Sequence, residues 1–101
     1  MISENWIVSA ATRYDCLDHL DKDEAYSFVI CSPRHYDNVH RDIATYIDDW
    51  VMECVVGEEQ GFIDKFGKFH DRSAALKIAK EANQLIRKTP PENQLFSEDL
   101  Y

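Results

Sequence analysis

Two short stretches of the sequence place cationic side chains where a helix is expected to begin. Arg34 and His35 fall in the first turn of a helix predicted to start at Ser32, and Asp71 and Arg72 open a second predicted helix. Free backbone N–H groups and the dipole at a helix N-terminus favour an anion, whereas a cation there costs the helix some stability. The pattern therefore indicates an anion-binding site, although two solvated side chains at two helix starts would produce the same pattern.

The segment between these two helices, GFIDKFGKFHDR, contains three phenylalanines. Phe62 and Phe69 can pack in the core or against a cross-strand neighbour of a hairpin. Phe66 stands beside Gly67, at the expected turn. A phenylalanine at a turn either anchors the loop or offers its ring to a base, and base stacking contributes about 1–3 kcal/mol. Phe66 is therefore the stacking candidate.

Metal binding and nucleophilic catalysis receive less support from the sequence. No HxxxH or CxxC spacing is found among its histidines and cysteines, so we predict no metal site. Cys31 lies one residue before the predicted helix start, and His35 follows Cys31 by four residues. A thiol near a helix N-terminus can have a lowered pKa. A cysteine packed in a buried strand explains Cys31 equally well. We predict no catalytic residue and keep a minor nucleotide hydrolase that uses Cys31 or His35 as an alternative.

The elements that must position these residues follow from the apolar pattern. Residues 6–11 and 26–31 read as strands, the second nearly continuous in apolar character and therefore predicted to be central. Residues 13–24 are polar and predict a loop. After the Ser-Pro pair at 32–33, apolar residues recur every three or four positions and predict one amphipathic helix of about twenty residues. The members of this stripe are Tyr36, Val39, Ile43, Tyr46, Ile47, Trp50 and Cys54.

The second half of the chain predicts a hairpin followed by a helix. Residues 57–61 break the helical pattern, and residues 62–63 can pair with 68–69 across a turn that includes Gly67. Asp71 is a suitable N-cap for a helix that runs to Arg87 and Lys88 and stops at residues 89–91. The tail from residue 91 is apolar enough to pack as a short terminal strand or arm, either within the subunit or on a neighbouring one. The predicted fold class is α+β, with a small antiparallel sheet and two main amphipathic helices in the order strand, helix, hairpin, helix.

Length and charge limit the possible partners. The chain has 101 residues, which suits one ligand-binding domain spanning residues 1–101. Its net charge of −8 makes a long nucleic acid a poor partner, because binding that backbone relies on cationic surface. A few converging arginines could still bind a small phosphorylated ligand. An odd number of cysteines, no signal peptide and no stretch of ~20 apolar residues predict a cytosolic protein with no membrane partner.

Three segments resemble a known family: ICSPRHYD, EQGFIDKFGKFHDRSAALKIA and the terminal LFSEDLY. Their order resembles that of small phage proteins that act as nucleotide sponges against the Thoeris defence system. These proteins sequester cyclic ADP-ribose isomers made by the host's TIR-domain proteins, so that the immune effector stays inactive. The similarity covers most of residues 30–101 and extends more weakly to IVSAATRYD near the start.

The resemblance implies a binding protein, not an enzyme, that holds its ligand intact without a cofactor in the cytoplasm of the infected bacterium. It also implies a homodimer or higher homo-oligomer whose site forms between protomers. Some relatives of this kind also hold cyclic di- or trinucleotides. An inhibitor that acts on a host protein through its acidic surface is the main alternative.

The resemblance further implies roles for individual residues. Arg34 would contact the phosphates of the ligand, and a ring of the segment from Phe62 to Phe66 would stack on adenine. The start of the second helix would line the pocket with Asp71 and Arg72. Near the end of that helix, Arg87 would contribute a further contact.

Overall fold

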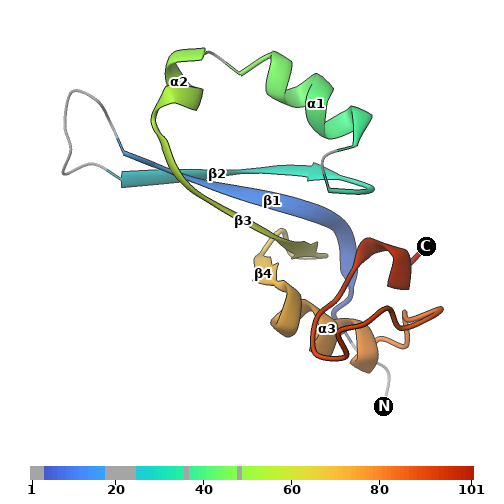
Figure 1. Cartoon of the computed structure of the whole chain (residues 1–101). Coiled ribbons are helices and arrows are strands. Elements are labelled where there is room, and N and C mark those ends of the chain that lie inside the picture. The colour runs from blue at the N-terminus through green and yellow to red at the C-terminus, as the bar shows by residue number, and fades with distance from the viewer. Residues whose placement is uncertain (1–3, 18–24, 36, 48) are drawn as a thin grey trace.

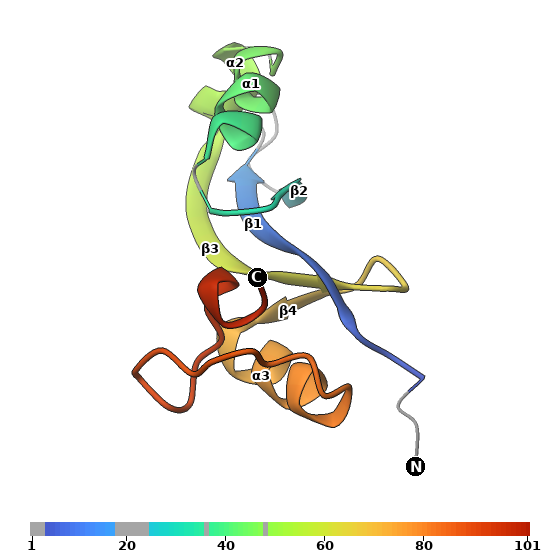
Figure 2. The same cartoon turned by 90° about the vertical axis from the view of Figure 1, so that its right-hand side faces the viewer.

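A four-stranded antiparallel sheet forms the centre of the molecule, as the computed structural model shows for residues 4–17, 25–35, 37–47 and 49–101. Its strands are β1 (Ile7–Leu17), β2 (Ala25–Ser32), β3 (Val55–Asp64) and β4 (Phe69–Asp71), in the order β2-β1-β3-β4. The helices are α1 (Asn38–Thr45), α2 (Asp49–Glu53), α3 (Arg72–Glu81) and a short 3-10 helix, η1 (Ser97–Asp99). Figures 1 and 2 show α1 and α2 near one end of the molecule and α3 with the C-terminal segment near the other. The predicted α+β class is confirmed.

The prediction that residues 13–24 form a loop is wrong for residues 13–17. These residues extend β1, where they pair with β2 on one side and β3 on the other. Tyr14 and Cys16 are buried while Arg13 and Asp15 remain partly exposed. This alternation is the period-two pattern of a strand with one covered face, and the high polarity of the segment concealed it. Residues 18–24 lie outside the described part of the chain.

The second predicted strand is an edge strand rather than a central one. Among the described residues, β2 pairs only with β1, and β1 and β3 occupy the middle of the sheet. A continuous apolar run is compatible with either position. Here helix α1 lies beside β2 and contacts it (Figure 1). The apolar residues of β2 are therefore partly covered by a helix, although β2 has only one neighbouring strand among the described residues.

The single long helix predicted after Ser32 is replaced by two short ones. Ser32 is the last residue of β2, and its hydroxyl donates to the carbonyl of Arg34 within a turn. Asp37 is the true N-cap of α1, because its carboxylate accepts from the N–H of His40 at 2.9 Å. A second carboxylate oxygen accepts from the N–H of Arg34 at 2.9 Å. An aspartate cap competes effectively with the upstream serine, so Arg34 and His35 lie in a turn and not in a helix.

Residues 57–61, which break the helical pattern of the sequence, are part of strand β3 and not a loop between elements. Gly61 permits the close approach of β4, because an added Cβ would lie 2.1 Å from the carbonyl oxygen of His70. The hairpin prediction is confirmed, with Ile63 paired to Phe69 and Gly67 at a φ of 80° in the turn. Glycine adopts this positive φ without the steric cost that other residues incur.

Asp71 caps α3 as predicted, accepting from the N–H of Ala74 at 2.8 Å. The helix nevertheless ends at Glu81 instead of near Lys88. Asn83 takes a φ of 56°, a conformation that ends helices. The side-chain amide of Gln84 then pairs with the backbone of Ile7 through two hydrogen bonds of 2.8 Å. These long-range bonds draw the chain away from the helix axis.

The C-terminal segment packs within the chain as an arm and not as a strand. Leu95 is fully buried and joins the core formed with residues of β1, β3 and α3. The backbone N–H of Leu95 donates to the carbonyl of Arg72 at 3.0 Å. The core cluster consists of Ile7, Ala10, Phe62, Ala75, Leu76, Ala79 and Leu95. This packing brings η1 beside the start of α3.

A candidate anion-binding cavity

One cavity of about 230 Å³ collects residues from four separate parts of the chain. The turn after β2 contributes Arg34 and His35, and the first residue of α3 contributes Arg72. The full lining is Arg34, His35, Gln60, Arg72, Phe96, Ser97 and Glu98. Three residues that the sequence predicted for an anion site are therefore brought together by the fold.

Arg34 has a donor to spare in this cavity. One guanidinium nitrogen, Nη2, donates to the carbonyl of Tyr101, and the guanidinium lies 4.9 Å from the centre of the Tyr101 ring. The other nitrogen, Nη1, is buried and has no hydrogen-bond partner among the described residues. A buried donor without a partner is costly, and an anion would satisfy it only if the Arg34 side chain turned this nitrogen toward the cavity.

Arg72 occupies the middle of the cavity wall. Its Nη1 donates to the carbonyl of Leu95 at 2.7 Å, and its Nη2 donates to the side chain of Gln60. The guanidinium also lies over the rings of Phe96, at 4.8 Å, and Phe62, at 5.9 Å. Burial lowers the pKa of Arg72, an effect that Glu98 opposes, but a guanidinium stays protonated at neutral pH. With five N–H groups and two of them used here, Arg72 keeps donors for a ligand.

His35 contributes a neutral ring. Its Nε2 lies 2.8 Å from the carbonyl of Gly61 and must donate to it, which leaves Nδ1 as an acceptor in the neutral ring. Burial lowers the pKa of His35 below its usual value, and the charge of Arg72 adds to this effect. The edge of the His35 ring meets the face of Phe62 at a centroid distance of 5.2 Å. The positive charge of the cavity therefore comes from the arginines.

A second cavity of about 250 Å³ adjoins the first and shares Gln60 and Arg72 with it. The remaining lining residues are Glu59, Asp71, Ser73 and Gln94. These side chains present carboxylate, amide and hydroxyl groups, which suit hydroxyls and amino groups rather than phosphate. Asp71 therefore lines the acidic cavity and does not line the cavity that holds Arg34.

The two phenylalanines predicted to contact the ligand, Phe62 and Phe66, lie in different environments, and neither lines either of these two cavities. Phe62 is 0% exposed and lies beneath His35 and Arg72, so it packs in the core instead of offering a free face. Phe66 is 72% exposed at the hairpin turn and lines neither cavity. The ring that does line the first cavity belongs to Phe96. The sequence pattern gave no role to Phe96 because only the packing of the C-terminal arm brings it there.

Arg87 is not brought together with the other predicted residues. It lies beyond the end of α3, is exposed, and lines neither cavity. The prediction placed it near the end of a longer helix. Because the chain turns away at Asn83, the position of Arg87 no longer follows from helical spacing.

Asp99 stabilises the C-terminal segment that lines the first cavity with Phe96, Ser97 and Glu98. Its buried carboxylate accepts from the N–H of Thr89 at 2.6 Å and from the N–H of Phe96 at 3.0 Å. Lys88 lies 3.4 Å from the same carboxylate. Burial alone would raise the pKa of Asp99, but these hydrogen bonds and the lysine charge hold it below the usual value. The carboxylate thereby orients Phe96 toward Arg72.

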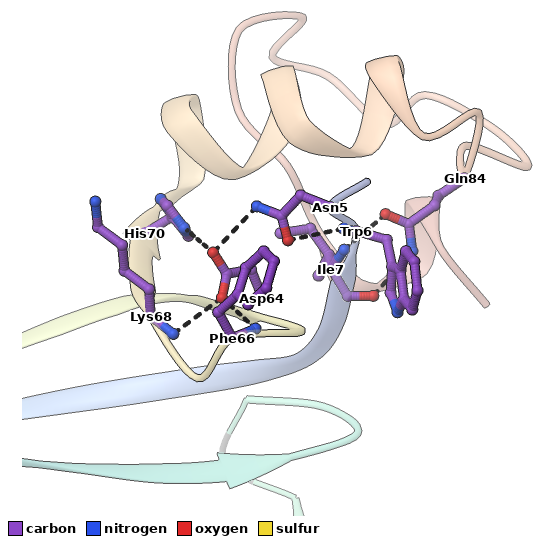
Figure 3. Close-up of polar contacts among 8 residues, drawn as sticks. All are labelled: Asn5, Trp6, Ile7, Asp64, Phe66, Lys68, His70 and Gln84. Carbon is purple, nitrogen blue, oxygen red and sulfur yellow. Dashed lines mark hydrogen bonds and ion pairs between the residues drawn. The ribbon is translucent and has the colours of Figure 1, made fainter. Parts of the chain in front are cut away.

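A second buried carboxylate, Asp64, anchors the hairpin that precedes α3 (Figure 3). It accepts from the backbone N–H groups of Phe66 and Lys68, from the amide of Asn5 at 3.1 Å and from the ring of His70 at 2.8 Å. Burial would raise the pKa of Asp64, but these hydrogen bonds outweigh it and hold the pKa far below its usual value. The carboxylate therefore links the N-terminal segment to the β3–β4 turn.

These shifts predict how stability depends on pH. His35 and His40 have lowered pKa values in the folded state, so the unfolded state binds more protons as pH falls through about 6.5. Asp64 and Asp99 also have lowered values, so their contribution is present above about pH 4 and lost below it. We expect the free energy of unfolding, measured by urea titration, to fall first between about pH 7 and 5.5 and then more steeply below about pH 4. A rise in stability from pH 7.5 to 5.5 would contradict the assignment of the histidines.

Cys31 is placed in a different setting from the cavity. Its thiol is half-buried and lines an apolar groove with Val8, Pro33 and Val39. Burial raises the pKa of Cys31, which is the opposite of what an activated thiolate requires. Within the described ranges, no cluster of three or more histidine, cysteine or acidic side chains could hold a metal ion.

The fold and the cavity define a small α+β domain with a cationic cavity beside an acidic one. The chain belongs to the family of the phage T4 y16D protein, whose family model matches residues 6–101. No curated protein and no solved structure matches the chain. Within the described part of the chain, no helix is long and apolar enough to cross a membrane. The family places the chain among phage proteins.

Proposed function

We propose that this protein binds a small anionic nucleotide in the cavity between Arg34 and Arg72 and holds it without cleavage. The observation that carries the proposal is the convergence of two arginines with unused N–H donors in a chain of net charge −8. Glu98 lines the same cavity and offsets only one of the two arginine charges, so the cavity keeps a net positive charge that an anion would balance. Guanidinium groups bind phosphate with two parallel hydrogen bonds.

The pair of adjoining cavities supports a nucleotide over a simple anion. The phosphate groups would contact Arg34 and Arg72, and the ring of Phe96 lines the same cavity, where it already lies against the guanidinium of Arg72. Sugar hydroxyls would donate to Glu59 or Asp71 in the acidic cavity. The ligand thus needs anionic groups at one end and hydroxyl or amino groups at the other.

For the ligand itself we propose a cyclic ADP-ribose type signal, which the protein sequesters to keep a host immune effector inactive. The resemblance to Thoeris anti-defence sponges supports this choice, and membership of a phage protein family is compatible with it. The setting of Cys31, in another groove and with a raised pKa, favours binding over hydrolysis.

Arg34→Ala is expected to weaken ligand binding by about 10- to 100-fold, the equivalent of one charge-assisted hydrogen bond. Calorimetric titration of the purified chain with cyclic ADP-ribose isomers, ADP-ribose and inorganic phosphate would measure the change. The melting temperature should shift little, because Arg34 is half-exposed, its side chain donates to the carbonyl of the C-terminal residue, and alanine keeps the backbone hydrogen bond to Asp37.

Arg87→Ala is the matched control for this experiment. The cavity geometry predicts unchanged affinity, whereas the family resemblance predicts a loss, so the variant separates the two expectations. Chromatography of ligand released by heat should return it intact. Wild-type affinity in Arg34→Ala would refute the cavity, and recovery of a cleaved product would refute sequestration.

A further inference from the structure

The side chain of Arg34 is held by Tyr101 and not by the other residues that line the first cavity. Nη2 of Arg34 donates to the main-chain carbonyl of Tyr101, and the guanidinium lies 4.9 Å from the centre of the Tyr101 ring. No other hydrogen bond or ion pair joins this side chain to a described residue. The position of this positive charge in the cavity therefore depends on Tyr101.

Tyr101 is itself fastened to the turn that carries Arg34. Its hydroxyl donates to the carbonyl of Pro33, the residue before Arg34, and its backbone N–H donates to the carbonyl of Ser97 at 3.2 Å. Residue 101 accordingly lies near the turn that follows β2 (Figure 1). Because Tyr101 is 44% exposed and is not a member of the core cluster, it can leave the turn while the core stays intact.

The contact with Tyr101 competes with an anion for the same guanidinium. A guanidinium binds a phosphate through two parallel N–H bonds. In Arg34, Nη2 donates to Tyr101, and Nη1 is buried without a partner among the described residues. The two terminal nitrogens are thus not available together to a phosphate until the side chain turns. Turning the side chain breaks its hydrogen bond to Tyr101.

We propose that Tyr101 is an autoinhibitory latch on the first cavity, which the nucleotide displaces from Arg34 when it binds. This inference rests on the proposed function and adds a regulation of the same site. A site that is competent only in the unlatched state binds with an affinity reduced by the fraction of molecules in that state. Weakening the latch should therefore strengthen binding, which is the opposite of what the loss of a ligand contact does.

Variants of Tyr101 test the sign of this effect. Tyr101→Ala removes the ring contact and the anchoring hydroxyl. It should raise the affinity for cyclic ADP-ribose isomers and ADP-ribose by about 3- to 10-fold in calorimetric titration, the equivalent of one hydrogen bond. Tyr101→Phe removes only the hydroxyl and should give a smaller gain. Tyr46→Ala is the matched control, because Tyr46 is 90% exposed at the C-cap of α1 and lines neither cavity.

A double variant separates a latch from a general loosening of the C-terminal segment. The latch acts through Arg34, so adding Tyr101→Ala to Arg34→Ala should change the remaining affinity by less than about 2-fold. A general loosening would change the affinity equally with and without Arg34. Far-UV circular dichroism and the melting temperature show whether each variant is folded.

The results distinguish the latch from the nucleotide site itself. Binding by wild type with equal or weaker binding by folded Tyr101→Ala would overturn the latch and leave the proposed function intact. An equal gain in Tyr46→Ala, or a gain that persists in the double variant, would also overturn the latch. Failure of wild type and of both Tyr101 variants to bind any of these nucleotides would overturn the proposed function and the latch together. Binding by Tyr101→Ala alone would support both.

Discussion

Replacing Asp64 with alanine should lower the free energy of unfolding by about 3–5 kcal/mol, the cost of breaking a buried charged network. The carboxylate is buried and accepts four hydrogen bonds, two from backbone N–H groups and two from the side chains of Asn5 and His70. Each buried donor left without a partner costs about 1–3 kcal/mol. Total stability of a domain this size is about 5–15 kcal/mol, so the loss is a large part of it.

The measurement is a urea denaturation curve together with the melting temperature. The melting temperature should fall by more than about 10 °C, since each kcal/mol corresponds to about 4–8 °C in a domain of this size. Asp42→Ala serves as the control, because Asp42 is an exposed aspartate on α1. Asp64→Asn should give an intermediate loss, because the amide keeps one acceptor oxygen. Equal stability of Asp64→Ala and Asp42→Ala would show that the network does not hold the hairpin.

Arg72→Ala should reduce nucleotide affinity by about 100-fold or more, corresponding to about 2.7 kcal/mol or the loss of two charge-assisted hydrogen bonds. Arg72 lines both cavities and is held against Phe96 and Gln60. Its removal takes away a positive charge that both cavities share. The effect should exceed that of Arg34→Ala, because Arg34 lines only the first cavity.

Arg72 also supports the C-terminal arm through its hydrogen bond to Leu95, so a loss of affinity could reflect a displaced arm. Arg72→Lys addresses this possibility, since it retains the charge but cannot form two parallel hydrogen bonds to a phosphate. We expect a loss of affinity in Arg72→Lys with a melting temperature closer to wild type. Full affinity in both Arg72 variants would exclude this cavity as the nucleotide site.

The sequence by itself determined the features that depend only on residues close together in the chain. The turn at Gly67 requires a positive φ, and Asp71 caps the N–H groups at the start of α3, so both were predictable from neighbouring residues. The same local reasoning marked Arg34, His35 and Arg72 as candidates for an anion site. For Arg34 and His35 the reasoning placed the residues in a helix, whereas they lie in a turn capped by Asp37, and the fold nevertheless brings them to one cavity with Arg72.

Only the tertiary structure decided features that depend on contacts between distant residues. The end of α3 depends on Gln84 pairing with Ile7, and the extension of β1 through residues 13–17 depends on pairing with a strand on each side. Phe96 joins the cavity because the buried carboxylate of Asp99 orients the C-terminal arm. Such long-range hydrogen bonds leave no period or spacing in the sequence. The sequence therefore determined which residues could bind an anion, and the fold decided which of them share a cavity.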